Sequence, residues 1–410
     1  KNLGRWIILV AVTTLLVGLL IAGQGLAQPT SIEQLGEFLY FDKNLSEPFG
    51  QSCASCHFPN AGFVDPNKGL PVSAGVVPGR FGDRNSPMSA YAMYSPIRYF
   101  DAGDGLWIGG QFWDSRAPGG TAGALHDPLA DQALGPFLNH LEMNNPDKAT
   151  VIRDVAASDY ADLFEEVWGA GSLDDVETAY DQVALSIAAF ERTALFGQFS
   201  SKYDAYLQAC LDLGGDKDDC AKGIGHDAAL AGSDTFTKKE WDGLQLFMDE
   251  DPGGAMCVAC HVADWIDPAD ANYGGLDLIV PDWSPDGTVP PVFTDFTYDN
   301  LGVPKSTDKL LRDLPVDLGL GKVVVDEAEN GKFKVMTLRN IQLTKPYAHN
   351  GFFRNLEDIT HFYNTRDVPA EGWPPPEYPL TVNTDELGDL GLSQADEDAL
   401  VKFMKTLTDK

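Results

Sequence analysis

Residues 50–63 read GQSCASCHFPNAGF and contain the motif that decides the fold, CASCH at residues 53–57. The same pattern returns as CVACH at residues 257–261. Two thiols separated by two residues can add to the two vinyl groups of one haem, and the histidine that follows is then placed to ligate the iron. Each motif therefore predicts one covalently attached haem c, bound by Cys53, Cys56 and His57 or by Cys257, Cys260 and His261.

Two other kinds of site use closely spaced cysteines, and neither fits this chain. A thioredoxin-like redox pair needs no histidine after its second cysteine and occurs in a βαβ pattern, which the sequence does not show. A zinc site needs four ligands close together, whereas the two motifs lie far apart in the chain. Two chance matches among only 6 cysteines and 7 histidines are not credible.

Length and charge limit the remaining possibilities. The chain has 410 residues, more than one hydrophobic core supports, so two domains are expected. Its 29 Lys and Arg against 61 Asp and Glu give a formal net charge of −32. This balance argues against nucleic-acid partners, because such binding depends on basic side chains that neutralise phosphates. A negative surface instead attracts basic partners.

The N-terminus and the two remaining cysteines indicate the compartment. Residues 6–23 form an uncharged apolar run after Lys1 and Arg5, intermediate in length between a signal-peptide core and a membrane span. We expect a retained inner-membrane helix, with a cleaved signal segment as the alternative. Either places the rest of the chain on the periplasmic side. In that oxidising compartment Cys210 and Cys220 are expected to form a disulfide, with two free thiols as the weaker alternative.

Apolar residues recur at helical intervals in separate stretches, and no alternation typical of strands persists. Ser172 or Asp174 is expected to cap the helix that follows them. The order helix, C-x-x-C-H, loop, helix occurs twice, which predicts two similar modules with a boundary near residue 205. The stretches with helical periodicity lie within residues 28–50, 151–168, 174–196, 237–250, 356–364 and 393–408.

The motifs stand in an order that resembles the bacterial dihaem cytochrome c peroxidase and MauG family over most of residues 30–408. The resemblance implies a mainly α-helical fold of two c-type cytochrome domains, each packed around a covalent haem, in addition to the N-terminal membrane helix. It divides the chain into a membrane anchor or signal segment (1–27), a peroxidatic haem domain (28–205) and an electron-transfer haem domain (206–410). The segments that carry the resemblance are QSCASCH, GDRNSP, GQFWDSRA, DQALGPFLNHLEM, AAFERT, CVACH, FTDFTYDNLGVP and TLRNIQLTKPYAHNGFFRNLEDITHFYN.

The resemblance also bears on the iron ligands opposite the two motif histidines. In the classical peroxidases a loop of the form S-x-G-H caps the first iron, but residues 73–76 read SAGV here, and valine cannot ligate iron. The first iron is therefore expected to have an open face, with Met88 or Met93 as an alternative ligand. The family ligand of the second iron corresponds to Tyr363, with His361 or Met336 as the alternative.

The resemblance to this family also implies which residues are catalytic. Glu142 and Gln132 match the family's distal acid/base pair, in which a carboxylate moves a proton between the two oxygens of peroxide. The family has proline where His140 stands, which leaves open a second titrating group near this pocket. Trp113 matches the tryptophan between the two haems, where an indole can carry a hole from one to the other.

A calcium site between the domains is also implied. It corresponds to Asn85 and the backbone carbonyls of Thr344 and Pro346, and such oxygen ligands suit Ca²⁺. An ordinary turn asparagine is the alternative for Asn85.

Two enzymatic outcomes remain open, with hydrogen peroxide as the oxidant in both. In a peroxidase, a small redox protein such as a c-type cytochrome supplies electrons, and the net charge favours this reading. In a MauG-like modifier, tryptophan residues of a partner protein are oxidised, and Val76 and Tyr363 favour that reading. A hypothesis of another class is a non-catalytic electron-transfer cytochrome subunit of a membrane complex.

Overall fold

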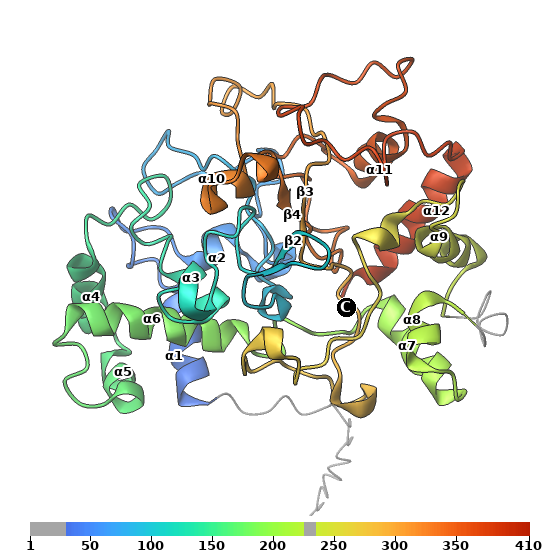
Figure 1. Cartoon of the computed structure of the whole chain (residues 1–410). Coiled ribbons are helices and arrows are strands. Elements are labelled where there is room, and N and C mark those ends of the chain that lie inside the picture. Colours follow the sequence, from blue (N-terminus) through green and yellow to red (C-terminus); the bar gives the residue numbers. More distant parts are fainter. Residues whose placement is uncertain (1–29, 225–234) are drawn as a thin grey trace, which may run out of the picture.

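The computed structural model describes residues 30–224 and 235–410, and in these ranges the chain is mainly helical, as predicted (Figure 1). The predicted membrane helix within residues 6–23 lies outside the described residues. Among the residues that the structure describes, no helix is long and apolar enough to cross a membrane.

The α-helices are separated by long irregular segments. Helices of the first half are α1 (Ser31–Phe41), α2 (Cys53–Cys56), α3 (Pro128–Ala133), α4 (Lys148–Ala156), α5 (Ala161–Trp168) and α6 (Val176–Glu191). Those of the second half are α7 (Lys202–Asp212), α8 (Lys217–Lys222), α9 (Lys238–Met248), α10 (Leu320–Val324), α11 (Leu356–Thr365) and α12 (Gln394–Met404).

Side chains just before the helices explain where several of them begin. The Thr30 hydroxyl accepts a hydrogen bond from the N–H of Glu33, whose carboxylate accepts from the N–H of Thr30. Thr237 and Glu240 form the same reciprocal pair at the start of α9. Each pair satisfies two backbone N–H groups that a helix terminus would leave without partners.

The cap of α6 differs from the prediction. Asp175 caps this helix, because its carboxylate accepts hydrogen bonds from two N–H groups of the first turn. The sequence had favoured Ser172 or Asp174, and both lie in the turn that precedes the helix. Three acceptor side chains within four residues are equivalent in the sequence, and only the path of the backbone selects one of them.

Each half of the chain contains a similar pair of packed helices. In the first half α1 packs on α6, and in the second half α9 packs on α12 (Figure 1). Each contact contains a glycine: a Cβ on Gly36 would lie 1.9 Å from the Ser186 carbonyl oxygen, and one on Gly243 would lie 2.0 Å from that of Ala399. These backbones therefore approach more closely than any side chain would allow.

The residues that the structure describes form two hydrophobic cores. One lies mostly between residues 35 and 199, but Tyr273, Leu278, Val289, Val292 and Phe296 also pack into it. The other lies between residues 203 and 407. A segment of the second half thus packs into the first core, and the predicted boundary near residue 205 stays a prediction.

Residues 30–224 and 235–410 contain two small antiparallel sheets, although the sequence predicted no strands. The first pairs β1 (Tyr99–Asp101) with β2 (Leu106–Ile108), and the second pairs β3 (Tyr298–Asp299) with β4 (Phe333–Lys334). Strands of two or three residues are too short to show alternation, so pattern reading could not detect them. The second sheet matters for function because β4 lines the cavity described below.

The predicted disulfide is confirmed: Cys210 in α7 is bonded to Cys220 in α8. The other four cysteines of the chain are those of the two C-x-x-C-H motifs.

Candidate haem-binding sites

The first motif occupies one helical turn. His57 follows α2 directly, and its backbone N–H donates to the carbonyl oxygen of Cys53 over 2.9 Å. Its ring Nδ1 lies 3.3 Å from the carbonyl oxygen of Phe63. Because a carbonyl only accepts, Nδ1 carries the proton, and the lone pair on Nε2 is free to ligate a metal.

The second motif repeats this arrangement. The N–H of His261 donates to the carbonyl oxygen of Cys257 over 2.9 Å, and its Nδ1 lies 3.0 Å from the carbonyl oxygen of Phe293. Phe63 and Phe293 both have positive φ, 57° and 56°. Large side chains rarely adopt this backbone conformation, so the two modules use the same unusual bend in the residue that orients the histidine.

Both sites fit a covalent haem. Burial lowers the pKa of His57, and it lowers the pKa of His261 to about 4. Yet the cysteines and histidines of both motifs keep accessible surface. A side chain that lies deep in a protein and still has solvent-accessible surface is next to a cavity or cleft. Each site therefore offers the two thiols and the imidazole nitrogen that haem c requires, and the second motif also lines a large cavity.

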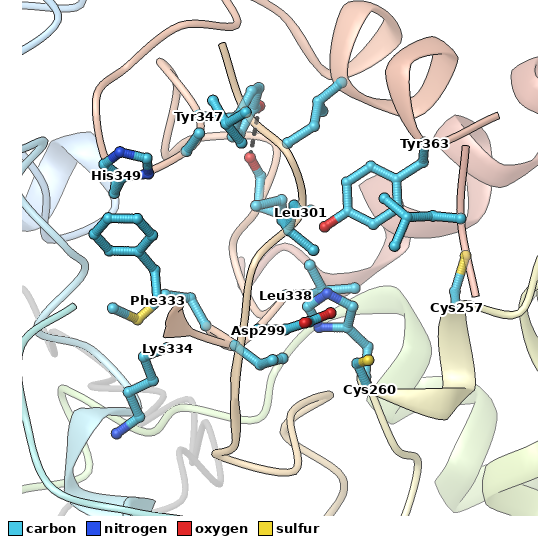
Figure 2. A pocket seen from close by; sticks show the side chains of 18 of the residues that line it. Cys257, Cys260, Asp299, Leu301, Phe333, Lys334, Leu338, Tyr347, His349 and Tyr363 are labelled. Atoms are coloured by element: carbon cyan, nitrogen blue, oxygen red, sulfur yellow. Dashed lines mark hydrogen bonds between the residues drawn. The ribbon is translucent and has the colours of Figure 1, made fainter. Parts of the chain in front are cut away.

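A cavity extends from the second motif to Tyr363 on α11. Figure 2 shows the Tyr363 hydroxyl directed into this cavity, which Cys257 and Cys260 also line. The hydroxyl makes no hydrogen bond within the described residues, and burial raises the pKa of Tyr363. A phenol so placed is available to a ligand in the cavity.

The alternatives to Tyr363 differ in their surroundings. Both ring nitrogens of His361 face carboxylates, with Nδ1 2.9 Å from Glu397 and Nε2 3.3 Å from Glu371. His361 does not line the cavity, so its nitrogens are not available there. Met336 does line the cavity and remains the alternative.

The structure brings Glu142 to the first motif. The side-chain amide of Gln51 lies 3.5 Å from Cys56 Sγ and donates to the carbonyl oxygen of Ala74, in the loop 73–76 that is hydrogen-bonded to the main chain of Glu142. Burial is the main cause of the raised pKa of the Cys53 and Cys56 thiols, and the charge of Glu142 makes a smaller contribution. Burial in turn raises the pKa of Glu142, while a hydrogen bond of 2.9 Å from Asn139 Nδ2 acts in the opposite direction. A carboxyl with a raised pKa is suited to accept and return a proton near neutral pH.

The SAGV loop is docked against the segment that carries Glu142. The N–H of Val76 donates to the Glu142 carbonyl oxygen over 2.9 Å, and a Cβ on Gly75 would lie 2.2 Å from the carbonyl oxygen of Leu141. Arg80 adds hydrogen bonds to the His140 carbonyl and the Asn144 side chain. The loop thus supports the main chain at Glu142.

For the other residues predicted at the first site, the described ranges show no hydrogen bond to the first motif. Gln132 stands near the end of α3, and its side chain makes no hydrogen bond within the described residues, so its role stays a prediction. His140 is exposed. Of the two alternative ligands, Met93 is buried in the first core, whereas Met88 lines the cavity that reaches the second motif.

Trp113 connects the two sites. It lines the cavity of the second motif, and its indole Nε1 donates to the Asn85 carbonyl oxygen over 2.9 Å. The adjacent Ser86 donates its hydroxyl to the carbonyl oxygen of Cys56 over 3.1 Å. A short run of hydrogen-bonded groups therefore leads from the first motif to Trp113 and the wall of the second site.

The three residues of the expected calcium site line the same cavity, namely Asn85, Thr344 and Pro346. The Asn85 Nδ2 donates to the carbonyl oxygen of Pro71 over 3.0 Å, which leaves its side-chain oxygen available. Within residues 30–224 and 235–410, no group of three or more His, Cys, Asp or Glu side chains could hold a metal ion. Any cation here would depend on carbonyl and amide oxygens.

Sequence reasoning missed several buried charged groups around the cavity. Lys334 is 6% exposed, and its ammonium donates to Ser95 Oγ and the carbonyl oxygen of Gly110 rather than to a carboxylate. His349 stacks on Phe333 with ring centroids 3.6 Å apart, as Figure 2 shows. Arg84 pairs with both Asp114 and Asp317. Arg84 and Asp114 lie in two of the quoted motif segments, whereas Asp317 lies in none of them.

Comparison with known proteins agrees with this geometry. Residues 30–210 match the family model described as di-haem cytochrome c peroxidase. The chain is 34% identical to the methylamine utilization protein MauG of Paracoccus denitrificans, over 93% of this chain and 89% of that protein. The chain belongs to the di-haem cytochrome c peroxidase family.

Further members of this di-haem cytochrome c peroxidase family support the assignment. Cytochrome c551 peroxidase of Pseudomonas aeruginosa is 28% identical over 81% of this chain and 71% of its own length. The crystal structure of the diheme peroxidase BthA from Burkholderia thailandensis matches with a TM-score of 0.72 and 28% identity, covering 93% of this chain and 87% of that one. The predicted mainly helical di-haem fold, the two haem c groups and the oxidoreductase class are confirmed. The non-catalytic alternative does not fit relatives that are named as enzymes.

Proposed function

We propose that this di-haem enzyme uses hydrogen peroxide as its oxidant at the first site and exchanges electrons with a redox protein through the second. The observation that carries the proposal is the half-buried Glu142 carboxyl, whose main chain is hydrogen-bonded to the loop that also contacts the first motif through Gln51. Haem bound at the two motifs supplies iron that can take an oxygen ligand and exchange electrons.

Glu142 acts on the proton. Its carboxyl accepts the proton of the inner peroxide oxygen and returns it to the outer one, so that the outer oxygen leaves as water. The raised pKa of Glu142 suits both steps, and the hydrogen bond from Asn139 fixes the orientation of the carboxyl. Gln132 is the proposed hydrogen-bond partner of the peroxide or of a water molecule.

At the second site, Tyr363 is the residue proposed to hold the haem iron together with His261. Its hydroxyl faces the cavity and has no protein partner within the described residues, which supports this role. An anionic oxygen ligand favours oxidised iron. Trp113, held by its hydrogen bond to Asn85, is the aromatic group proposed to carry electrons between the sites.

A calcium ion held by Asn85, Thr344 and Pro346 is proposed to hold together the two chain segments that carry these residues, between the two haem sites. The support is that all three residues line one cavity and that Asn85 retains a free side-chain oxygen.

The net charge of −32 favours a basic electron carrier such as a small c-type cytochrome. A second candidate function is oxidation of tryptophan residues in a partner protein, favoured by the 34% identity to MauG and by the placement of Tyr363. Covalent haem and the Cys210–Cys220 disulfide both suit the periplasm. The inner-membrane tether within residues 6–23 stays a prediction.

A spectroscopic titration tests the proposal. The ferric holoprotein should show a high-spin electron paramagnetic resonance signal that disappears when one equivalent of peroxide is added. Repeated turnover with a reduced c-type cytochrome would identify a peroxidase, and a covalently altered tryptophan in a co-expressed partner would identify the modifier. Two low-spin signals that do not respond to peroxide would overturn the proposal.

A further inference from the structure

Glu191, the last residue of α6, carries a buried carboxyl that has no assigned role. The residue is 5% exposed, and its Oε2 atom has no hydrogen-bond partner. No hydrogen bond or ion pair within the described residues involves this carboxyl. The adjacent Arg192 is engaged elsewhere, because its guanidinium donates to both oxygens of Asp127 over 2.6 and 2.7 Å. Since nearly all buried polar groups have partners, this exception calls for a reason.

The position of Glu191 suggests that reason. Its charge is the second-largest cause, after burial, of the raised pKa of both Cys53 and Tyr40. Tyr40 in turn donates its hydroxyl to the carbonyl oxygen of His57 over 2.9 Å. The neighbouring Phe190 packs edge-on against Tyr40, with ring centroids 5.4 Å apart, so Glu191 stands at the end of α6 that packs on the residue holding the motif histidine.

Four charged or titratable groups interact electrostatically with Glu191. They are Tyr40 from α1, Cys53 from α2, Arg192 directly after α6 and Asp127 directly before α3. Arg192 is the only cation among them and is neutralised by Asp127. Burial raises the pKa of Glu191 to about 8, with smaller contributions from Arg192, which lowers it, and Asp127, which raises it.

We propose that Glu191 binds a proton when one electron enters the first site, so that reduction of this site is coupled to proton uptake. The inference rests on the proposed function, because it requires a haem at Cys53, Cys56 and His57. The balance is simple: a redox protein supplies one electron, solvent supplies one proton, and the carboxylate of Glu191 becomes a carboxylic acid. One positive charge is lost nearby on reduction, so the carboxylate loses an attraction and holds a proton more tightly.

A redox titration of the holoprotein between pH 6 and pH 9 tests this coupling, with the first haem followed by its own absorption. In the wild-type protein the midpoint potential of the first haem should fall as the pH rises, because ionised Glu191 favours the oxidised state. Glu191→Gln cannot ionise, so its potential should coincide with that of the wild type at pH 6, fall less with pH, and lie above it at pH 9. The inference is wrong if Glu191→Gln keeps the full pH dependence.

A matched control comes from the second half of the chain. Glu397 is also 5% exposed, but it accepts hydrogen bonds from the Asn364 side chain, and Glu397→Gln should leave the first potential unchanged at every pH.

Infrared spectra of the wild-type protein give a second readout that does not depend on a variant folding. Reduction of the first haem should produce a carboxylic acid C=O band, and the absence of this band would also contradict the inference. A holoprotein that reacts with peroxide but shows no such coupling refutes only this inference, whereas failure to react with peroxide refutes the proposed function.

Discussion

Arg339 Nη1 lies 2.9 Å from Asp204 Oδ1, and the two side chains are 0% and 1% exposed. The guanidinium also donates two hydrogen bonds to the carbonyl oxygen of Pro291. Four aromatic rings surround it, two from the first core and two from the second. These rings belong to Tyr91, Phe199, Tyr203 and Phe293, and their centroids lie 4.8–5.7 Å from the guanidinium carbon.

Loss of Asp204 should strongly destabilise the fold. In Asp204→Ala the buried guanidinium keeps its charge without a carboxylate, and breaking such a pair costs about 3–5 kcal/mol. Urea unfolding of the holoprotein measures the loss. The exposed pair of Lys238 and Asp242 is the control, since Asp242→Ala should cost at most about 0.5 kcal/mol. Equal losses in the two variants would contradict this reading of the Arg339 pair.

Gly36→Ala should separate α1 from α6. The added Cβ would stand 1.9 Å from the carbonyl oxygen of Ser186, and overpacking of this kind costs about 1–3 kcal/mol. Because α1 carries Tyr40, less haem should also attach at the first motif. Thermal unfolding and haem content check both effects. Gly69→Ala is the control, since its nearest contact would be 3.4 Å away, and a similar loss there would show that crowding at α6 is not the cause.

Lys334 should give the stability a specific dependence on pH. Burial lowers the pKa of Lys334 to about 7, whereas an unfolded lysine titrates near about 10.4. Between these values the unfolded chain binds more protons, so the contribution of Lys334 to stability grows as the pH rises. From pH 7 to pH 9 the wild type should therefore gain about 2 kcal/mol relative to Lys334→Met. Urea unfolding at both pH values provides the comparison, and parallel changes in the two proteins would rule out the effect.

Glu142→Gln should slow the reaction with peroxide by about 10²–10⁴-fold, because the amide cannot carry the proton between the two oxygens. Stopped-flow mixing of the ferric holoprotein with peroxide gives the rate, at equal haem content. Glu37→Gln, an exposed change on α1, serves as the control and should react at the wild-type rate. An unimpaired Glu142→Gln would remove this residue from the proton pathway.

Tyr363→Phe should change the absorption and magnetic resonance spectra of the second haem and leave those of the first unchanged. The matched control is Tyr347→Phe, because Tyr347 lines the same cavity but donates its hydroxyl to the carbonyl oxygen of Ile341. Spectra of Tyr363→Phe that match the wild type would assign the ligand to another residue, with Met336 the first to test.

Part of the site was accessible from the sequence because its determinants are local. Attachment of haem needs two thiols and an imidazole within five residues, so the spacing of the two motifs was sufficient to predict two haems. Helical periodicity and the short interval between Cys210 and Cys220 were equally local signals, and the structure bears them out. Glu142 was also proposed from the sequence, but only by resemblance, since a lone glutamate carries no signal of burial.

What only the tertiary structure decided depends on contacts between residues far apart in the chain. Glu191 belongs to an ordinary amphipathic helix in the sequence, and its burial follows from how α6 packs. Lys334 and Arg339 read as surface residues until their neighbours are known. The sequence therefore determined which groups bind the cofactors, and packing decided which charges lie around them, because desolvation depends on surroundings that no local pattern encodes.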